Sequence, residues 1–330
     1  MTTKITLNPI SSTEIDWLKQ PGLNHKKSEV LCRMGIFSYY KTQSEIREAI
    51  GNEWSHLEVW VDEDIENQGF LAWTDKVAIL SFRGTDSGSD WLINAQAFFP
   101  EQHDLGGRRH NGFNKIWSQC SARIFEILDK NINPDSVLWI TGHSLGGALS
   151  TAAAAEFLSN KPNRIKDFYV MTFGSPRYGN EDFQKAYDQR MLQKHWFYAN
   201  QSDPVPHLGP NWMGYRHTGI LKYFSKQGMY LDVDKNAVGL QASMNTAEEG
   251  ALNHMYLIDK DIEKFSQSEI DLKILVTAMM AQANQPEISI ISGVTKIDDA
   301  SGTLQGDSLW TAAAHNSALY WKNINFIANL

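Results

Sequence analysis

The chain has 330 residues, 42% of them hydrophobic, which is enough to fill the core of one large α/β domain. Its formal net charge is −8 and its sequence pI is near 5.7, and the lysines and arginines are scattered, so we expect no nucleic-acid partner. No segment approaches 18 uninterrupted apolar residues, so we also expect no transmembrane segment.

The start of the chain and its cysteines bear on the cellular compartment. The first twenty residues contain no apolar stretch of signal-peptide length. We therefore expect a soluble protein that is cytoplasmic or exported by a non-classical route, although Met1 could have been added to a trimmed mature chain. Two cysteines, Cys32 and Cys120, cannot make a disulfide framework. We expect each to be a small buried hydrophobe rather than half of a bridge or a reactive thiol.

Short apolar runs alternate with helical patterns along the chain. Strands are predicted at 57–61, 70–74, 77–82, 137–141, 168–174 and 195–200, and helices at 113–131 and from Leu145 to near Asn160. In the tail, 271–283 is typical of a helix and 287–297 of a strand. This order predicts one α/β domain over residues 1–330, with a mostly parallel central sheet and helices on both faces.

One corner in this pattern has a chemical meaning. The sequence Gly142-His143-Ser144-Leu145-Gly146 follows a compact apolar strand and opens a helix rich in small residues. Gly142 and Gly146 let the backbones approach closely, while Ser144 is expected to adopt strained dihedrals and expose its hydroxyl. Ser144 is therefore the candidate nucleophile; the alternative is a tight glycine turn with a bystander serine.

A serine nucleophile needs a base, and the base needs an acid to orient it. Asp203 follows the strand at 195–200 and is the candidate acid; alternatively, it is a turn residue before Pro204. His254 begins an apolar stretch after a polar loop and is the candidate base. The alternatives are His207, in the same loop as Asp203, and His217, in an apparent strand at 215–223.

Acyl transfer also requires an oxyanion hole. One donor is expected to be the backbone N–H of Leu145, directly after the nucleophile. The other is expected at the end of the strand at 77–82, where Gly84 permits a close turn and Thr85 carries both an N–H and a hydroxyl.

Together, these segments resemble the class 3 lipase family, the fungal triacylglycerol-lipase type of α/β-hydrolase. The resemblance covers roughly residues 50–265 and leaves 1–49 and 266–330 as extensions expected to pack on the core. It rests on FRGTDSGSDWL (82–92), HNGF (110–113), TGHSLGGALS (141–150), TFGSPRYGN (172–180) and NQSDPVPHLGP (200–210). It implies Ser144, Asp203 and His254 as the triad, with Thr85 and Leu145 as oxyanion donors.

The resemblance also implies a lid over the acyl-binding groove at residues 89–107. This segment holds an apolar cluster that includes Trp91, Leu92, Phe98 and Phe99. A short amphipathic segment between glycines could open at a lipid surface. The alternative is that these side chains form core under a long loop.

The expected function is hydrolysis of acyl-lipid esters at a lipid–water interface through an acyl-serine intermediate, with no metal and no organic cofactor. Triacylglycerol lipase is the leading activity, and phospholipase A1 or short-chain carboxylesterase is the alternative. Peptidase or thioesterase activity would use the same triad. A more distant alternative is an inactive module that binds lipid or protein.

Overall fold

The computed structural model describes residues 3–62, 67–84, 100–160, 165, 167–200, 203, 205–209, 214–224, 230–233, 290–291, 294–297 and 317–329. Its helices are α1 (Ser12–Leu18), α2 (His25–Phe37), α3 (Gln43–Ile50), α5 (Asn111–Asn131), α6 (Leu145–Asn160), α7 (Glu181–Met191), the 3-10 helix η2 (Val205–His207) and α11 (Ser317–Ala328). Its strands are β1 (Thr3–Thr6), β2 (His56–Asp62), β3 (Asn67–Trp73), β4 (Val77–Phe82), β5 (Pro100–Gln102), β6 (Arg108–His110), β7 (Val137–His143), β8 (Asp167–Phe173), β9 (Gly179–Asn180), β10 (His195–Asn200), β11 (Tyr215–Arg216), β12 (Ile220–Phe224), β13 (Tyr230–Val233), β14 (Ile290–Ile291) and β15 (Val294–Ile297).

The central sheet has the strand order β13-β12-β10-β8-β7-β4-β3-β2. Strands β4, β7, β8, β10 and β12 run parallel to one another, and β2, β3 and β13 are antiparallel additions at the two edges. This is the mostly parallel sheet that the sequence predicts. Since parallel strands end at the same edge, the segments that follow β4, β7 and β10 are brought to one side of the molecule.

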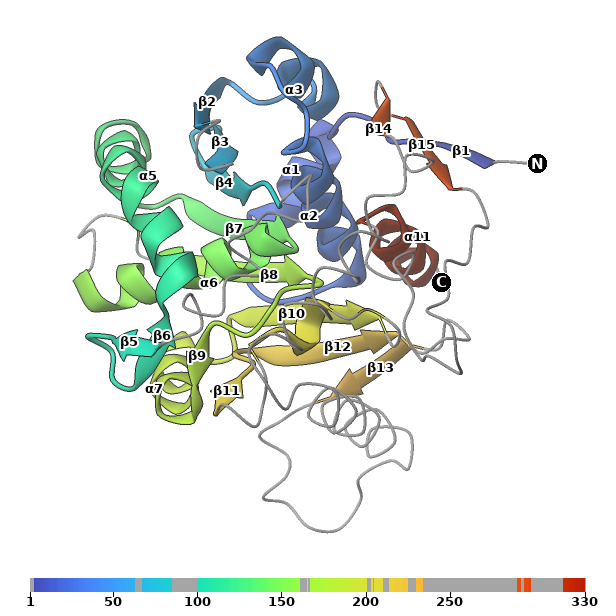
Figure 1. Ribbon diagram of the computed structural model, residues 1–330. Helices are drawn as coiled ribbons and strands as arrows, with labels where there is room; N and C mark the ends of the chain where they lie inside the picture. Colours follow the sequence, from blue (N-terminus) through green and yellow to red (C-terminus); the bar gives the residue numbers. More distant parts are fainter. Residues whose placement is uncertain are drawn as a thin grey trace.

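Helices cover both faces of this sheet (Figure 1). The side chains of its strands alternate between the two faces. On β7, Leu138 and Ile140 pack in the cluster formed with α5 and α6, whereas Trp139 packs in the cluster formed with α2. Both clusters are buried, so β7 is apolar in a continuous run, as expected for a central parallel strand.

The helix α2 is buried on nearly every side because it lies between the sheet and α11. Its start is fixed by Asn24, whose side chain accepts a hydrogen bond from the Lys27 N–H at 2.8 Å. Two side chains of the sheet bond to its carbonyls: the Ser81 hydroxyl donates to Met34 and the Thr141 hydroxyl donates to Leu31. The N-terminal part of the chain therefore contributes directly to one face of the sheet.

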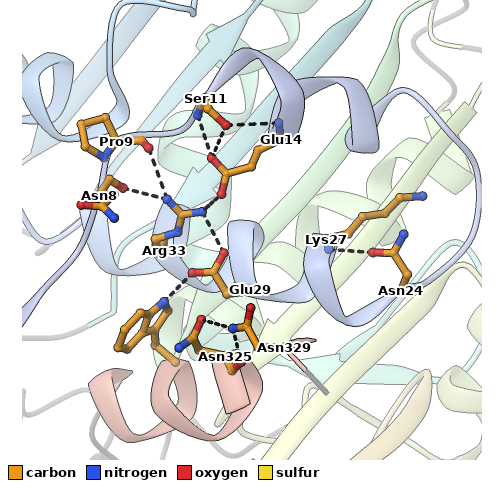
Figure 2. A network of polar contacts seen from close by, with 11 residues as sticks. Asn8, Pro9, Ser11, Glu14, Asn24, Lys27, Glu29, Arg33, Asn325 and Asn329 are labelled. Carbon is orange, nitrogen blue, oxygen red and sulfur yellow. Dashed lines mark hydrogen bonds and ion pairs between the residues drawn. The ribbon is translucent and has the colours of Figure 1, made fainter. Parts of the chain in front are cut away.

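A polar network secures α11 against α2 (Figure 2). The indole N–H of Trp321 donates to Glu29 at 2.6 Å, and Glu29 in turn forms a buried ion pair with Arg33 at 2.8 Å. Arg33 also pairs with Glu14 of α1. Together with the apolar contacts of Ile324, this network ties α1, α2 and α11 together.

Two local expectations were wrong. His217 lies between β11 and β12 rather than inside one strand, because Gly219 adopts a φ of +76° that interrupts the extended run. The predicted strand at 287–297 is instead a pair of short antiparallel strands, β14 and β15, and β15 also pairs with β1.

Other expectations were confirmed or lie outside the described residues. Cys32 and Cys120 are both buried and take part in no disulfide among the described residues, as predicted. The helix expected at 271–283 lies outside the described residues. The single-domain arrangement of residues 1–330 stays a prediction.

Candidate active site

The turn between β7 and α6 positions Ser144. Its φ is +59°, in the left-handed region that non-glycine residues seldom occupy, which confirms the expected backbone strain. The Ser144 N–H donates to the Phe173 carbonyl of β8 at 2.9 Å, and its own carbonyl accepts from the Gly147 N–H at 2.9 Å. These contacts hold the corner at both of its ends.

Two glycines make this corner sterically possible. A Cβ on Gly142 would lie 2.3 Å from the carbonyl carbon and oxygen of Gly146, and one on Gly146 would lie 2.2 Å from the Phe82 carbonyl oxygen. The strand β7, the start of α6 and the end of β4 therefore touch backbone to backbone. Only residues without a Cβ permit this contact, as the sequence predicts.

Leu145, the predicted oxyanion donor, is the first residue of α6 and is fully buried. The first N–H groups of a helix have no acceptor within the helix, and the helix dipole favours negative charge there. A developing oxyanion beside Ser144 would therefore meet a favourable field.

Asp203 lies just beyond β10 and is completely buried. Its N–H donates to the Asn200 carbonyl at 3.1 Å, which starts the turn. One carboxylate oxygen, Oδ1, accepts the Val205 N–H at 2.9 Å, and the other, Oδ2, accepts the Tyr320 hydroxyl at 2.6 Å. Two donors on two different oxygens fix the plane of the carboxylate.

Ser144 and Asp203 lie at the same edge of the sheet. They follow β7 and β10, which run parallel with only β8 between them. This is the edge at which ligands bind in open α/β sheets. The structure therefore brings the candidate nucleophile and the candidate acid to one side of the fold.

The end of β4 approaches the same corner. A Cβ on Gly84 would lie 3.0 Å from the Ser144 Cβ and 2.7 Å from the His143 carbonyl oxygen, so the backbone before Thr85 lies against the nucleophile turn. Thr85 itself lies outside the described residues.

The remaining predicted site residues lie outside the described residues as well: His254, Trp91, Leu92, Phe98 and Phe99. Of the alternative bases, His217 has its Nε2 atom 2.7 Å from the Pro206 carbonyl, and its ring stacks on Phe197. Since a carbonyl can only accept, Nε2 donates there, and Nδ1 is the nitrogen of His217 left to accept a proton.

Two tyrosines that the sequence did not single out flank the site. The Tyr39 hydroxyl lies 2.9 Å from His143 Nδ1, and the ring of Tyr320 meets the other side of the His143 imidazole at a centroid distance of 5.8 Å. Burial raises the pKa of both tyrosines, and the neighbouring Asp203 raises that of Tyr320 further, so both hydroxyls stay protonated. No sequence signal marks them, because each lies far from the motifs along the chain.

Metal sites and membrane spans can be judged for the described residues only. Among them, no group of three or more histidine, cysteine, aspartate or glutamate side chains is arranged to hold a metal ion. No helix in the same part of the chain is long and apolar enough to cross a membrane.

The known proteins to which this chain is similar include lipases and a phospholipase. The family model described as Lipase (class 3) matches residues 79–212. The secreted mono- and diacylglycerol lipase 1 of Fusarium solani is 37% identical over 147 residues, which cover 43% of this chain and 42% of that protein. The phospholipase A1-II 1 of Oryza sativa subsp. indica is 39% identical over 132 residues, which cover 39% of this chain and 30% of that protein. The chain thus spans less than half the length of these curated relatives.

A solved structure supports the fold. Lipase II from Rhizopus niveus superposes with a TM-score of 0.51 at 19% sequence identity, covering 67% of this chain and 83% of that one. With the parallel sheet and the strained serine turn, this likeness identifies the α/β-hydrolase fold.

Proposed function

From the match of residues 79–212 to the Lipase (class 3) family model, we propose that this chain is a serine ester hydrolase that cleaves acyl-lipid esters, with triacylglycerols as the leading substrate. The observation that carries the proposal is Ser144 at a positive φ of +59°, on the turn that opens α6. The buried Asp203 at the same sheet edge supports it.

In the proposed mechanism, His254 removes the proton of Ser144, and the serine oxygen attacks the ester carbonyl. Asp203 orients the imidazole and stabilises its charged form. The N–H groups of Leu145 and Thr85 hold the oxyanion of the tetrahedral intermediate. The alcohol leaves with the proton from the imidazole, and a water molecule then releases the acid from Ser144 by the same steps.

The identity of the base has a second candidate. His315 lies five positions before Tyr320 in the sequence, and five residues span at most about 18 Å. Since Tyr320 donates to Asp203, a base at position 315 would be compatible with the length of the chain between them. We propose His254 from its place in the sequence, and the variants His254→Asn and His315→Asn decide between them. The variant that lowers kcat by about 10⁴-fold or more identifies the base.

The nucleophile is tested by labelling with a fluorophosphonate probe. We expect the wild-type protein to label and Ser144→Ala not to label. Ser136→Ala is the matched control, since Ser136 is also buried and lies at the opposite end of β7, where its hydroxyl donates to the Asp75 carbonyl. Equal labelling of the wild type and Ser144→Ala would refute the enzyme proposal and favour a lipid- or protein-binding module.

The substrate class is tested by hydrolysis of triacylglycerols, diacylglycerols, phospholipids and short p-nitrophenyl esters. The similarity to a protein named phospholipase A1 gives phospholipids the second place. We propose that Trp91, Leu92, Phe98 and Phe99 belong to a lid that opens at a lipid surface. Activity should then rise when a substrate exceeds its solubility. An unchanged rate per molecule across that limit would contradict the lid.

A further inference from the structure

The helix α11 lies outside the matched segment 79–212, yet one of its side chains reaches the candidate acid. Tyr320 is fully buried, and its hydroxyl donates to Asp203 Oδ2 at 2.6 Å. The same hydroxyl accepts the Asn200 N–H at the end of β10 at 3.0 Å. A backbone amide, a phenol and a carboxylate therefore form one chain of donors, in which each hydrogen bond strengthens the next.

Several contacts keep this hydroxyl in place. The Asn323 side chain, one turn further along α11, donates to the Asn200 side chain at 3.1 Å. Trp321 on the same helix bonds to Glu29 of α2. The Tyr320 ring also packs edge-on against Phe173 of β8. The position of α11 is thus set from α2, β8 and β10 together, and a rotation of the helix would remove the hydroxyl from Asp203.

We propose that Tyr320 is a positioning residue for the reaction: its hydroxyl, held by the Asn200 N–H, fixes the Asp203 carboxylate in the orientation that aligns the catalytic histidine. The inference rests on the proposed hydrolase function and deepens it. The Val205 N–H holds Oδ1 and the Tyr320 hydroxyl holds Oδ2, so removal of this hydroxyl weakens the restraint on Oδ2. Misplacing a catalytic group by a fraction of an ångström is costly for the rate.

The test compares Tyr320→Phe with Tyr198→Phe. Both variants remove one fully buried phenolic hydroxyl, and both rings contact Phe173, but Tyr198 donates to Ser28 at 2.8 Å. Hydrolysis of a p-nitrophenyl ester is followed from pH 5 to pH 10, and rates are expressed per active site counted with the fluorophosphonate probe. Only folded protein is counted in this way.

We expect Tyr320→Phe to lower kcat about 10-fold to 100-fold with KM unchanged, since one hydrogen bond to a charged group is lost. A carboxylate that has lost a donor attracts the imidazolium more strongly, so the acid limb of kcat/KM should move to higher pH by about half a unit. Tyr198→Phe should change neither quantity. Wild-type kcat and an unmoved limb in Tyr320→Phe would overturn the inference, as would a loss equal to that of Tyr198→Phe.

Two further measurements keep the inference testable if Tyr320→Phe folds poorly. In the background of Asp203→Asn, removal of the Tyr320 hydroxyl should have a much smaller effect, and additive losses would refute action through Asp203. A 3-fluorotyrosine at position 320 keeps the ring and donates more strongly, so the acid limb should move to lower pH; an unmoved limb would refute the inference. Wild-type protein that neither reacts with the probe nor hydrolyses esters would refute the proposed function itself. An active wild-type protein whose kcat and acid limb are unchanged by Tyr320→Phe would refute the inference alone.

Discussion

A close backbone contact of the nucleophile turn can be tested by adding a single methyl group. In Gly142→Ala the new Cβ would lie 2.3 Å from the carbonyl carbon and oxygen of Gly146 and 2.9 Å from its Cα. These are backbone atoms of α6, so no side chain can rotate away to make room. The helix must move relative to β7, and Ser144 lies at the joint between them.

The expected magnitude follows from this geometry. Overpacking a close-packed core costs about 1–3 kcal/mol, and we expect about 3 kcal/mol here because the obstructing atoms are backbone. Gly35→Ala is the matched control. A Cβ on Gly35, in the interior of α2, would meet its nearest atoms at 3.9 Å, also on the backbone of Gly142 and His143. Alanine is better than glycine inside a helix, so this variant should gain about 0.5–1 kcal/mol.

Thermal unfolding and ester hydrolysis are the assays. The midpoint of unfolding of Gly142→Ala should fall by about 5 °C or more, and its rate per active site should fall at least about tenfold because the serine is displaced. Gly35→Ala should unfold at or above the wild-type midpoint with a normal rate. A Gly142→Ala variant with wild-type stability and rate would refute the view that backbone contact of β7 with α6 sets the position of Ser144.

Three further predictions concern stability and reactivity. Burial lowers the pKa of His110 to about 3, so the free energy of unfolding decreases as the pH falls below about 6.5, by up to about 1.4 kcal/mol per pH unit. The variant His110→Asn can still cap α5 and should lose less stability between pH 7 and pH 5 in thermal melts. A loss equal to that of the wild type would contradict this prediction. Native protein should show no thiol reactive towards Ellman's reagent, whereas unfolded protein should show both Cys32 and Cys120; rapid reaction of the native protein would refute their burial. Glu29→Ala breaks a buried ion pair and should lower the free energy of unfolding by about 3 kcal/mol in denaturant titrations. Glu58→Ala breaks an exposed ion pair and should lower it by at most about 1 kcal/mol. Similar losses in the two variants would contradict the role of burial.

The sequence predicted the features that depend on neighbouring residues. The bounds 77–82 and 195–200 agree with β4 and β10, because continuous apolar runs between polar turns define buried parallel strands. The turn at Ser144 was predictable for the same reason: the steric demand on its glycines is local. Where a residue of special backbone conformation was overlooked, as at Gly219, the strand prediction near it was wrong.

The contacts of Asp203 required the folded structure. Its two bonded carboxylate oxygens hold Val205, two positions away, and Tyr320, on a helix 117 positions away. Only the first of these follows from turn geometry. Tyr39 likewise meets His143 across 104 positions, and neither tyrosine belongs to a pattern that spacing or periodicity would reveal. Side chains that act across such distances are specified by the packing of helices, which local propensity does not encode.

The contacts of His143 with Tyr39 and Tyr320 have a consequence for how this protein folds. The three rings belong to segments near opposite ends of the sequence and to its middle, so their contacts are among the most non-local in the molecule. Non-local contacts form late, after the loop-closure entropy of the intervening chain has been overcome. A fragment cut to the matched segment 79–212 would carry both Ser144 and Asp203 but neither tyrosine. Such a fragment would be a poor unit for recombination with other domains, because Asp203 and His143 gain their tyrosine contacts only when the outer segments have docked.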